Sequence, residues 1–300
     1  MNVVLCADEG YARFGAVVMA SAIANASHPE WLRFYVLTPG LEEVTAERLR
    51  EMVSKSGAAL HIIDVDVQAL QGLPAGRFGI AALLPLLMHR YLPEDCERVI
   101  YLDCDMLVLG DLERLWELPL EGHVVAAAMD LCNPSSKHTR RDPDNYFNSG
   151  MMLVDLQAWR RESVAERALE YLQVSETARY PDQDALNEVL EGKWYRLEPE
   201  WNFQPTAYSA VEKRYAHLTE YLPALKAAIR YPRIVHFIGA VKPWHARCVH
   251  PFQDDFIVYS TLTPWPIEKS ALRSTLPWGR RIRLLLKQPK IRRRRRLARS

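Results

Sequence analysis

The sequence has no apolar run that approaches the roughly 18 consecutive residues a membrane-spanning helix needs. Its first ten residues, MNVVLCADEG, also lack the basic start and long apolar stretch of a secretory signal peptide. Both absences argue against an integral membrane protein and against a secreted one. We therefore expect a globular protein in the cytoplasm.

Cysteine is scarce and scattered along the chain. No two cysteines form a C-x-x-C pair, and their number is odd: Cys6, Cys96, Cys104, Cys132 and Cys248. This pattern predicts neither a disulfide framework nor a cysteine zinc site. We expect reduced cysteines that mostly serve as small core residues.

The glycine motifs that usually cradle nucleotide phosphates are missing as well. The first apolar stretch is followed by ADEGYARFG rather than by G-x-G-x-x-G, and no G-x-x-x-x-G-K-[ST] occurs anywhere. If this chain binds a nucleotide, it binds it by other means.

The net charge of +1 hides an uneven distribution. Residues 280–300 carry eleven Lys or Arg and no acid, which leaves 27 basic residues against 37 acidic ones in residues 1–279. Near an anionic membrane each such cation contributes about 1 kcal/mol, so we expect the tail to attach peripherally to the inner face of a membrane. A solubilising disordered tail and a nucleic-acid arm are the alternatives, but the acidic body makes nucleic acid an unexpected partner.

Strands and helices alternate in the first half of the chain, which is long enough to bury a large core. Apolar stretches predict strands at 2–7, 33–38, 60–65 and 99–108. Helical spacing predicts helices between them at 12–26 and 45–57. Such alternation indicates a mainly parallel, Rossmann-like sheet covered on both faces. Ligands of these sheets bind beyond the carboxyl ends of the strands.

The second half is less regular. It predicts strands at 124–131, 148–156 and 233–239 and helices at 163–173 and 182–192. The polar segment 131–147 is too long for an ordinary connection, which favours a lid, a binding loop or disorder.

The stretch VIYLDCDMLVLGDL, residues 99–112, places two aspartates at the end of a buried strand. In a strand, Asp103 and Asp105 would point to one side while Cys104 faces the other. Two such carboxylates form half of a site for Mg²⁺ or Mn²⁺, of the kind completed by a substrate diphosphate.

Spacing alone does not identify this pair as a metal site. About one D-x-D is expected by chance in a chain of this length, and the sequence has four: Asp64/Asp66, Asp103/Asp105, Asp142/Asp144 and Asp182/Asp184. The third pair flanks a proline in the polar segment, and the fourth lies where acids complement a helix N-terminus. The first also ends a strand, so it remains a competitor.

Six stretches together resemble one known family. They occur in the order and at about the separations seen in family-eight glycosyltransferases, and resemble most the bacterial lipopolysaccharide galactosyl- and glucosyltransferases: VVLCADEGYARFGAVVMASAIAN, RVIYLDCDMLVLGDLERLW, YFNSGMMLVDLQAWR, DQDALN, WNFQPT and VHFIGAVKPWH. The resemblance runs from about residue 2 to residue 245. It implies a single-domain GT-A fold, a UDP-hexose donor, Mn²⁺ or Mg²⁺, and transfer of galactose or glucose to a glycan or lipopolysaccharide-type acceptor with retention of configuration.

The resemblance also implies a domain division. We expect a GT-A domain at 1–250, an extension that packs on or near it at 251–279, and the basic tail at 280–300.

Roles for individual residues follow from the same resemblance. The implied metal ligands are Asp103, Asp105 and His236, and the implied catalytic residues are Gln183, Asp182 and Asn148. Lys242 would bind the diphosphate. The nucleotide-sugar would contact these residues: Ala7, Asp8, Tyr11, Asp103, Cys104, Asp130, Asn148, Gly150, Asp182, Gln183, Gly239 and Lys242.

Without the resemblance, several of these residues have an ordinary structural interpretation. A lone histidine in RIVHFIG is more often a core or edge residue than a ligand, and Lys242 could be a surface lysine beside a turn. Asn148 and Gly150 could form a turn before a strand, and Tyr11 could pack on the following helix.

The chain departs from the family pattern in one helix. An arginine is usual about seventeen residues before the first metal aspartate, whereas this sequence has Leu86 near that place and Arg90 a turn further on. Either Arg90 substitutes or activity is weakened. A non-catalytic sugar-nucleotide binding protein and a metal-dependent nucleotidyltransferase are therefore the alternative functions.

Retention arises either by double displacement or by attack of the acceptor on the same face of the sugar, and we favour the second route. Double displacement needs a nucleophile under the anomeric carbon, and the candidate position holds Gln183, which is a poor nucleophile.

Overall fold

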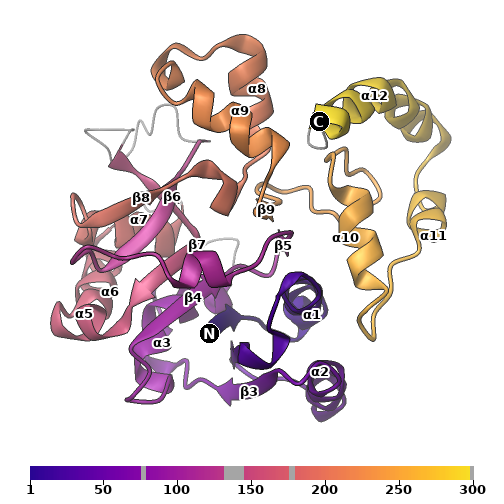
Figure 1. The fold of residues 1–300 in the computed structure, drawn as a ribbon. Coiled ribbons are helices and arrows are strands. Elements are labelled where there is room, and N and C mark those ends of the chain that lie inside the picture. Colours follow the sequence, from indigo (N-terminus) through magenta and orange to yellow (C-terminus); the bar gives the residue numbers. More distant parts are fainter. Residues whose placement is uncertain (76–78, 132–144, 176–179, 298–300) are drawn as a thin grey trace.

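A mixed seven-stranded sheet forms the centre of the computed structural model, which describes residues 1–75, 79–131, 145–175 and 180–297 (Figure 1). The strand order is β3-β2-β1-β4-β7-β6-β8, and β7 alone runs antiparallel to its neighbours. The strands are β1 (Asn2–Cys6), β2 (Arg33–Thr38), β3 (Ala59–Asp64), β4 (Arg98–Leu102), β6 (Val125–Met129), β7 (Phe147–Asp155) and β8 (Trp194–Leu197). The prediction of a mainly parallel mixed sheet is confirmed.

Helices cover both faces of this sheet because its strands are apolar on both sides. In β1, Val4 packs into one core cluster while Val3 and Leu5 pack into the other, and all three are fully buried. The first cluster includes residues of α3 (Leu84–Tyr91), α5 (Leu156–Arg161), α6 (Val164–Val174) and α7 (Pro181–Val189). The second includes residues of α1 (Glu9–Asn25) and α2 (Glu43–Ser54) and lies beside α4 (Glu113–Trp116).

The structure corrects the predicted strand at 99–108. Strand β4 ends at Leu102, residues 103–105 form a turn, and β5 (Met106–Val108) pairs antiparallel with β9 (Ile234–His236) in a separate two-stranded sheet. The carboxylates of Asp103 and Asp105 still lie on one side, beside His236, while Cys104 faces the core, but the turn places them there and not strand alternation. Only the prediction of one continuous strand is wrong. Both β4 and β5 are apolar and buried on either side of the turn, so hydrophobicity alone did not reveal that they belong to different sheets.

A third cluster lies beyond the small sheet and joins the C-terminal helices to it. It contains residues of β9, α8 (Thr206–Lys213), α9 (Leu222–Arg230) and α10 (Gln253–Ser260). The described residues also form α11 (Lys269–Ser274), α12 (Trp278–Leu297) and the short 3-10 helices η1 (Pro29–Trp31), η2 (Gln68–Leu70), η4 (Ile80–Leu83), η6 (Pro199–Asn202) and η7 (Ala216–Leu218).

The basic tail forms helix α12, which turns back onto the body of the protein (Figure 1). Arg294 donates two hydrogen bonds to Glu212 of α8, and Arg295 donates to Asp254 and Asp255 of α10. Part of the basic tail is thus matched by acids of the body.

No helix among the described residues is both long and apolar enough to cross a membrane. The polar segment 131–147 falls largely on residues 132–144, so the predicted lid and the pair Asp142/Asp144 lie outside the described residues.

Candidate active site

The predicted site residues gather at one edge of the sheet. This edge holds the carboxyl ends of β1, β4 and β6, and also the start of β7, because β7 runs in the opposite direction. Residues from these ends therefore meet although they are far apart in sequence: Ala7 and Asp8, Asp103, Asp130, and Asn148 and Gly150. The placement follows the rule that open sheets bind ligands at this edge.

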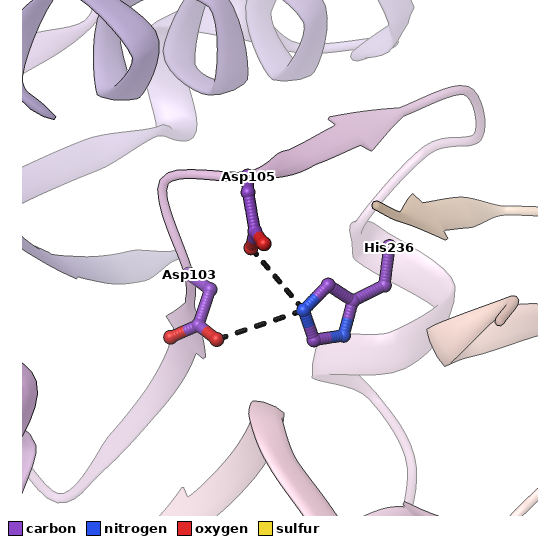
Figure 2. Close-up of side chains that lie close together, drawn as sticks. All are labelled: Asp103, Asp105 and His236. Carbon is purple, nitrogen blue, oxygen red and sulfur yellow. Dashed lines mark ion pairs between the residues drawn. The ribbon is translucent and has the colours of Figure 1, made fainter. Parts of the chain in front are cut away.

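Asp103, Asp105 and His236 form a compact cluster of potential metal ligands (Figure 2). One potential ligand atom from each lies within 4.8 Å of the other two. His236 Nε2 is 3.2 Å from Asp105 Oδ1 and 3.7 Å from Asp103 Oδ2. Two carboxylates and an imidazole at this spacing suit a divalent cation between them.

Hydrogen bonds and strand pairing set the positions of the three potential ligands. The register of the small sheet places Met106 opposite His236, and the Phe237 N–H donates to the Asp105 carbonyl at 2.9 Å. The Asp103 N–H donates to the Gly150 carbonyl at 2.8 Å, and the Tyr101 hydroxyl donates to the Asp103 carboxylate at 2.7 Å.

The two aspartates differ in their electrostatic surroundings. Burial by itself would raise the pKa of Asp105, but the Lys242 ammonium and His236 outweigh it and hold that pKa well below its usual range. Burial and the charge of Asp105 raise the pKa of Asp103. Lys242 contacts the Asp105 carboxylate directly and also donates to the Phe237 carbonyl.

Gly150 leaves room for the cluster. A Cβ atom at this position would lie 2.4 Å from Cε1 of His236, 2.6 Å from Oδ2 of Asp103 and 3.1 Å from Oδ1 of Asn148. Since real Cβ atoms do not approach neighbours so closely, any larger residue would displace the potential ligands.

A buried network of side-chain amides borders the metal cluster. Gln183 accepts from the Asn148 amide at 2.9 Å and donates to Asp130 at 2.8 Å and to the Tyr146 hydroxyl at 2.9 Å. The Ser149 N–H donates to the same Gln183 oxygen at 3.2 Å. All hydrogen-bonding groups of this amide are therefore engaged, which fixes its position.

Asp182 is the next carboxylate along this edge, at the start of α7. It accepts a 2.8 Å hydrogen bond from the Ser149 hydroxyl. Burial, together with the charge of Asp103, raises the pKa of Asp182 to about 7. The group therefore changes its charge near neutral pH in this arrangement.

The predicted nucleotide contacts lie at the start of α1. Asp8 caps this helix by accepting from the Tyr11 N–H at 2.9 Å, so the carboxylate has a structural role in addition to the expected one. Tyr11 is 45% exposed and makes edge contacts with Phe14 and Trp244. The rings of Phe14 and Trp244 stack with their centroids 3.6 Å apart. This contact joins α1 to the loop that carries Lys242.

Three further residues were predicted to contact the nucleotide-sugar. Two of them are buried, and the third is a glycine. Ala7 is buried and donates its N–H to the Leu37 carbonyl. Cys104 is buried, with its thiol 3.3 Å from the Cys6 carbonyl, so its side chain faces the core. Gly239 has a φ of 92°, which favours glycine, and a Cβ there would meet no atom within 4 Å.

In helix α3, neither Leu86, which stands near the position of the expected arginine, nor Arg90 points to the metal cluster through a described contact. Leu86 is fully buried in the core cluster that packs against β4. Arg90 donates to Glu166 of α6 at 2.8 Å, so its guanidinium takes part in an exposed ion pair between two helices.

Several residues of the site were not predicted from the sequence. Asn202, Ser149, Tyr101 and Tyr146 each bond to a predicted site residue. Asn202 belongs to WNFQPT, one of the six stretches that carry the resemblance, but we predicted no role for it.

Solved structures support the fold. The galactosyltransferase LgtC, solved in complex with donor and acceptor sugar analogs, matches with a TM-score of 0.78 and 26% identity over 94% of this chain and 99% of that chain. The GT-A fold predicted from the sequence is therefore confirmed.

Sequence comparisons identify the family. Residues 2–248 match glycosyl transferase family 8. General stress protein A of Bacillus subtilis is 30% identical over 276 residues, which span 88% of this chain and 94% of that protein. Lipopolysaccharide 1,2-glucosyltransferase of Escherichia coli K12 is 26% identical over 296 residues, which span 96% of this chain and 86% of that enzyme. This chain therefore belongs to glycosyl transferase family 8.

Proposed function

We propose that this glycosyltransferase moves galactose or glucose from a UDP-sugar to a glycan or lipopolysaccharide-type acceptor, with retention of configuration and with the help of a divalent cation. The cluster of Asp103, Asp105 and His236 at the ligand-binding edge of the sheet is the observation that carries the proposal. The relatives named as hexosyltransferases support the choice of sugar.

The cluster fits Mn²⁺ or Mg²⁺. Its donors are carboxylate oxygens and one imidazole nitrogen, and the side chains of Asp105 and His236 are only 10% and 5% exposed. Hard cations take oxygen ligands and commonly bind one or two carboxylates together with substrate phosphates. A bound cation would supply positive charge that stabilises the departing UDP.

Lys242 would provide a second positive charge for the diphosphate. Its ammonium lies against Asp105 and so reaches the metal cluster itself. Lysine binds phosphate as a compact point charge. The left-handed turn at Gly239 lets the backbone of the same loop approach the phosphates.

The amide network would bind the donor sugar and keep attack on one face. Gln183 is held by four hydrogen bonds and is a poor nucleophile, so we expect the acceptor hydroxyl to attack on the face that UDP leaves. The leaving phosphate would help to take up the acceptor proton. Mass spectrometry of the protein after reaction with the donor tests this, because a covalent glycosyl-enzyme at Gln183 or Asp182 would contradict it.

Release of UDP tests the proposed donor. We would screen UDP-galactose, UDP-glucose and their N-acetyl forms with Mn²⁺, and compare the wild type with Asp103→Asn. The proposal expects UDP release from a UDP-hexose that the variant largely loses. Binding without turnover would support a non-catalytic protein, and pyrophosphate release from a nucleoside triphosphate would support a nucleotidyltransferase.

The tail would attach the enzyme to an anionic membrane surface. Helix α12 leaves apolar side chains exposed among its cations: Trp278 is 77%, Leu285 64% and Leu286 75% exposed. Basic helices with exposed apolar residues bind anionic lipid interfaces. The division of the C-terminal part into an extension at 251–279 and a basic tail at 280–300 stays a prediction.

Liposome binding tests the membrane proposal. Deletion of residues 280–300 should release the protein from vesicles that contain anionic lipid while donor hydrolysis continues. Unchanged vesicle binding by the truncated chain would contradict the proposal. A variant with Leu285→Gln and Leu286→Gln separates the apolar contribution from that of the cations.

A further inference from the structure

Asn202 lies between the metal cluster and the amide network and contacts both. It is fully buried at the end of η6. Its side-chain oxygen is 3.0 Å from Nδ1 of His236, and its side-chain nitrogen donates to the Asn148 oxygen at 2.8 Å. One amide thus joins a potential metal ligand to a residue of the proposed sugar site.

Backbone hydrogen bonds hold Asn202 beside His236. The N–H of Phe203, the next residue, donates to the Ile234 carbonyl at 2.8 Å, and the His236 N–H donates to the Phe203 carbonyl at 3.0 Å. These bonds tie the segment after η6 to strand β9. The contact between Asn202 and His236 is therefore a fixed feature of the fold.

The hydrogen bonds around Asn148 determine which way its amide points. The backbone N–H of Gly150 is only a donor, and it lies 3.2 Å from the Asn148 side-chain oxygen. The Asp130 carboxylate only accepts, and it lies 3.3 Å from the Asn148 side-chain nitrogen. The Asn148 oxygen must therefore face Gly150, and it faces Asn202 as well.

The orientation of Asn148 fixes that of Asn202. Because Asn148 presents an oxygen, Asn202 must present its NH₂ group to it. The Asn202 oxygen then faces His236, so Nδ1 of the neutral imidazole must carry the proton. Nε2 is left with its lone pair directed toward the carboxylates of Asp103 and Asp105 (Figure 2).

From this geometry we infer that Asn202 is a positioning residue that holds His236 in the tautomer able to ligate a cation through Nε2. The inference rests on the metal role proposed above for His236. Ligating histidines commonly donate their other ring N–H to an oxygen acceptor, and loss of that acceptor weakens metal binding by about 10- to 100-fold. Asn202 also makes the metal cluster and the sugar-side network parts of one hydrogen-bonded unit.

Gln204 offers a matched control. It is also a buried amide of the same segment, but its hydrogen bonds go to the backbone of Met129 and Leu131. A purely structural role for Asn202 would make Asn202→Ala and Gln204→Ala similar in their effect on metal binding.

The first test reads the tautomer directly. In the metal-free wild-type protein labelled with ¹⁵N-histidine, nitrogen chemical shifts at mildly alkaline pH show which ring nitrogen is protonated, and His236→Gln assigns the signal. We expect the proton of His236 on Nδ1. A ring with a proton on Nε2 and none on Nδ1 in the wild type would overturn the inference without any need for a folded Asn202 variant.

The second test measures Mn²⁺ affinity by electron paramagnetic resonance of the free ion, with thermal unfolding as the check of folding. Asn202→Ala should weaken Mn²⁺ binding by about 10-fold or more, whereas Gln204→Ala should leave it within about twofold. Equal effects of the two variants would overturn the inference. If His236→Gln and Asp105→Asn also leave the affinity unchanged, the metal role itself fails, which is a different outcome.

Discussion

Two aspartate pairs stand at the ends of strands of this protein, and they have opposite surroundings. Asp64 is the last residue of β3, which lies at the edge of the sheet, and both Asp64 and Asp66 are exposed with Val65 buried between them. Asp103 and Asp105 follow β4 near the centre of the sheet, where Asp105 is only 8% exposed.

The pair that begins inside a regular strand, Asp64/Asp66, is the one without the cluster of potential metal ligands. Asp66 accepts a local hydrogen bond from the Gln68 N–H at 2.9 Å, as aspartate does in turns. Asp103 and Asp105 lie in a turn, where they meet His236 and Lys242 from the other end of the chain. Partners from distant segments, rather than D-x-D spacing, therefore distinguish the candidate metal site from a solvated pair.

Replacement of the aspartates should separate the two pairs most strongly. We expect Asp103→Asn or Asp105→Asn to lower UDP release by about 100-fold or more, because transition-state charge stabilisation worth several kcal/mol is lost. Asp64→Asn and Asp66→Asn should stay within about twofold. A steady-state assay with Mn²⁺ checks this, and equal losses at both pairs would remove the distinction.

A methyl group at Gly150 should disturb the same site without altering any charge. Gly150→Ala should abolish most UDP release and weaken Mn²⁺ binding, because the new Cβ would collide with His236 and Asp103. Gly279→Ala is the control, since a Cβ at Gly279 meets nothing within 4 Å. Mn²⁺ titration of both variants measures the difference, and normal binding by Gly150→Ala would refute the packing described.

Removal of Lys242 should show the cost of an uncompensated buried carboxylate. In the presence of a chelator, Lys242→Met should lower the free energy of unfolding by about 3 kcal/mol, because Asp105 loses its cation. Lys55→Met breaks an exposed ion pair with Glu51 and should change the free energy of unfolding by about 0.5 kcal/mol or less. Urea unfolding measures both, and similar values would mean that burial does not distinguish these pairs.

The stability of the metal-free protein should depend on pH through Asp182. Its folded pKa of about 7 lies above the ordinary value of 3.8, so between these limits the folded state holds a proton that the unfolded state has lost. Stability should therefore fall as the pH rises from about 4 to 7, by at most about 1.4 kcal/mol per pH unit. Asp182→Asn should flatten this part of the curve in denaturant titrations, whereas Asp66→Asn should not.

Arg90 should give the smallest effect. Because its guanidinium pairs with Glu166 at the surface, Arg90→Ala should change the free energy of unfolding by about 0.5 kcal/mol or less and UDP release by less than about twofold. A large loss of UDP release would show that Arg90 serves the donor after all, as a substitute for the arginine absent near Leu86.

The sequence predicted much of the fold because strand and helix patterns are local. The strand expected at 33–38 occurs with those bounds, and the helices expected after the first and second strands are α1 and α2. The break between β4 and β5 was missed because the apolar, buried pieces on both sides of it each have the pattern of a strand.

The sequence by itself determined which chemical groups stand at strand ends and, through six ordered motifs, the family to which the chain belongs. Only the tertiary structure decided which D-x-D meets a histidine and a lysine, which way the Asn148 amide points, and that Asn202 lies behind His236. The physical reason is that these contacts join residues up to about 140 positions apart. Strand order and hydrogen-bond direction set them, and neither is encoded by local spacing.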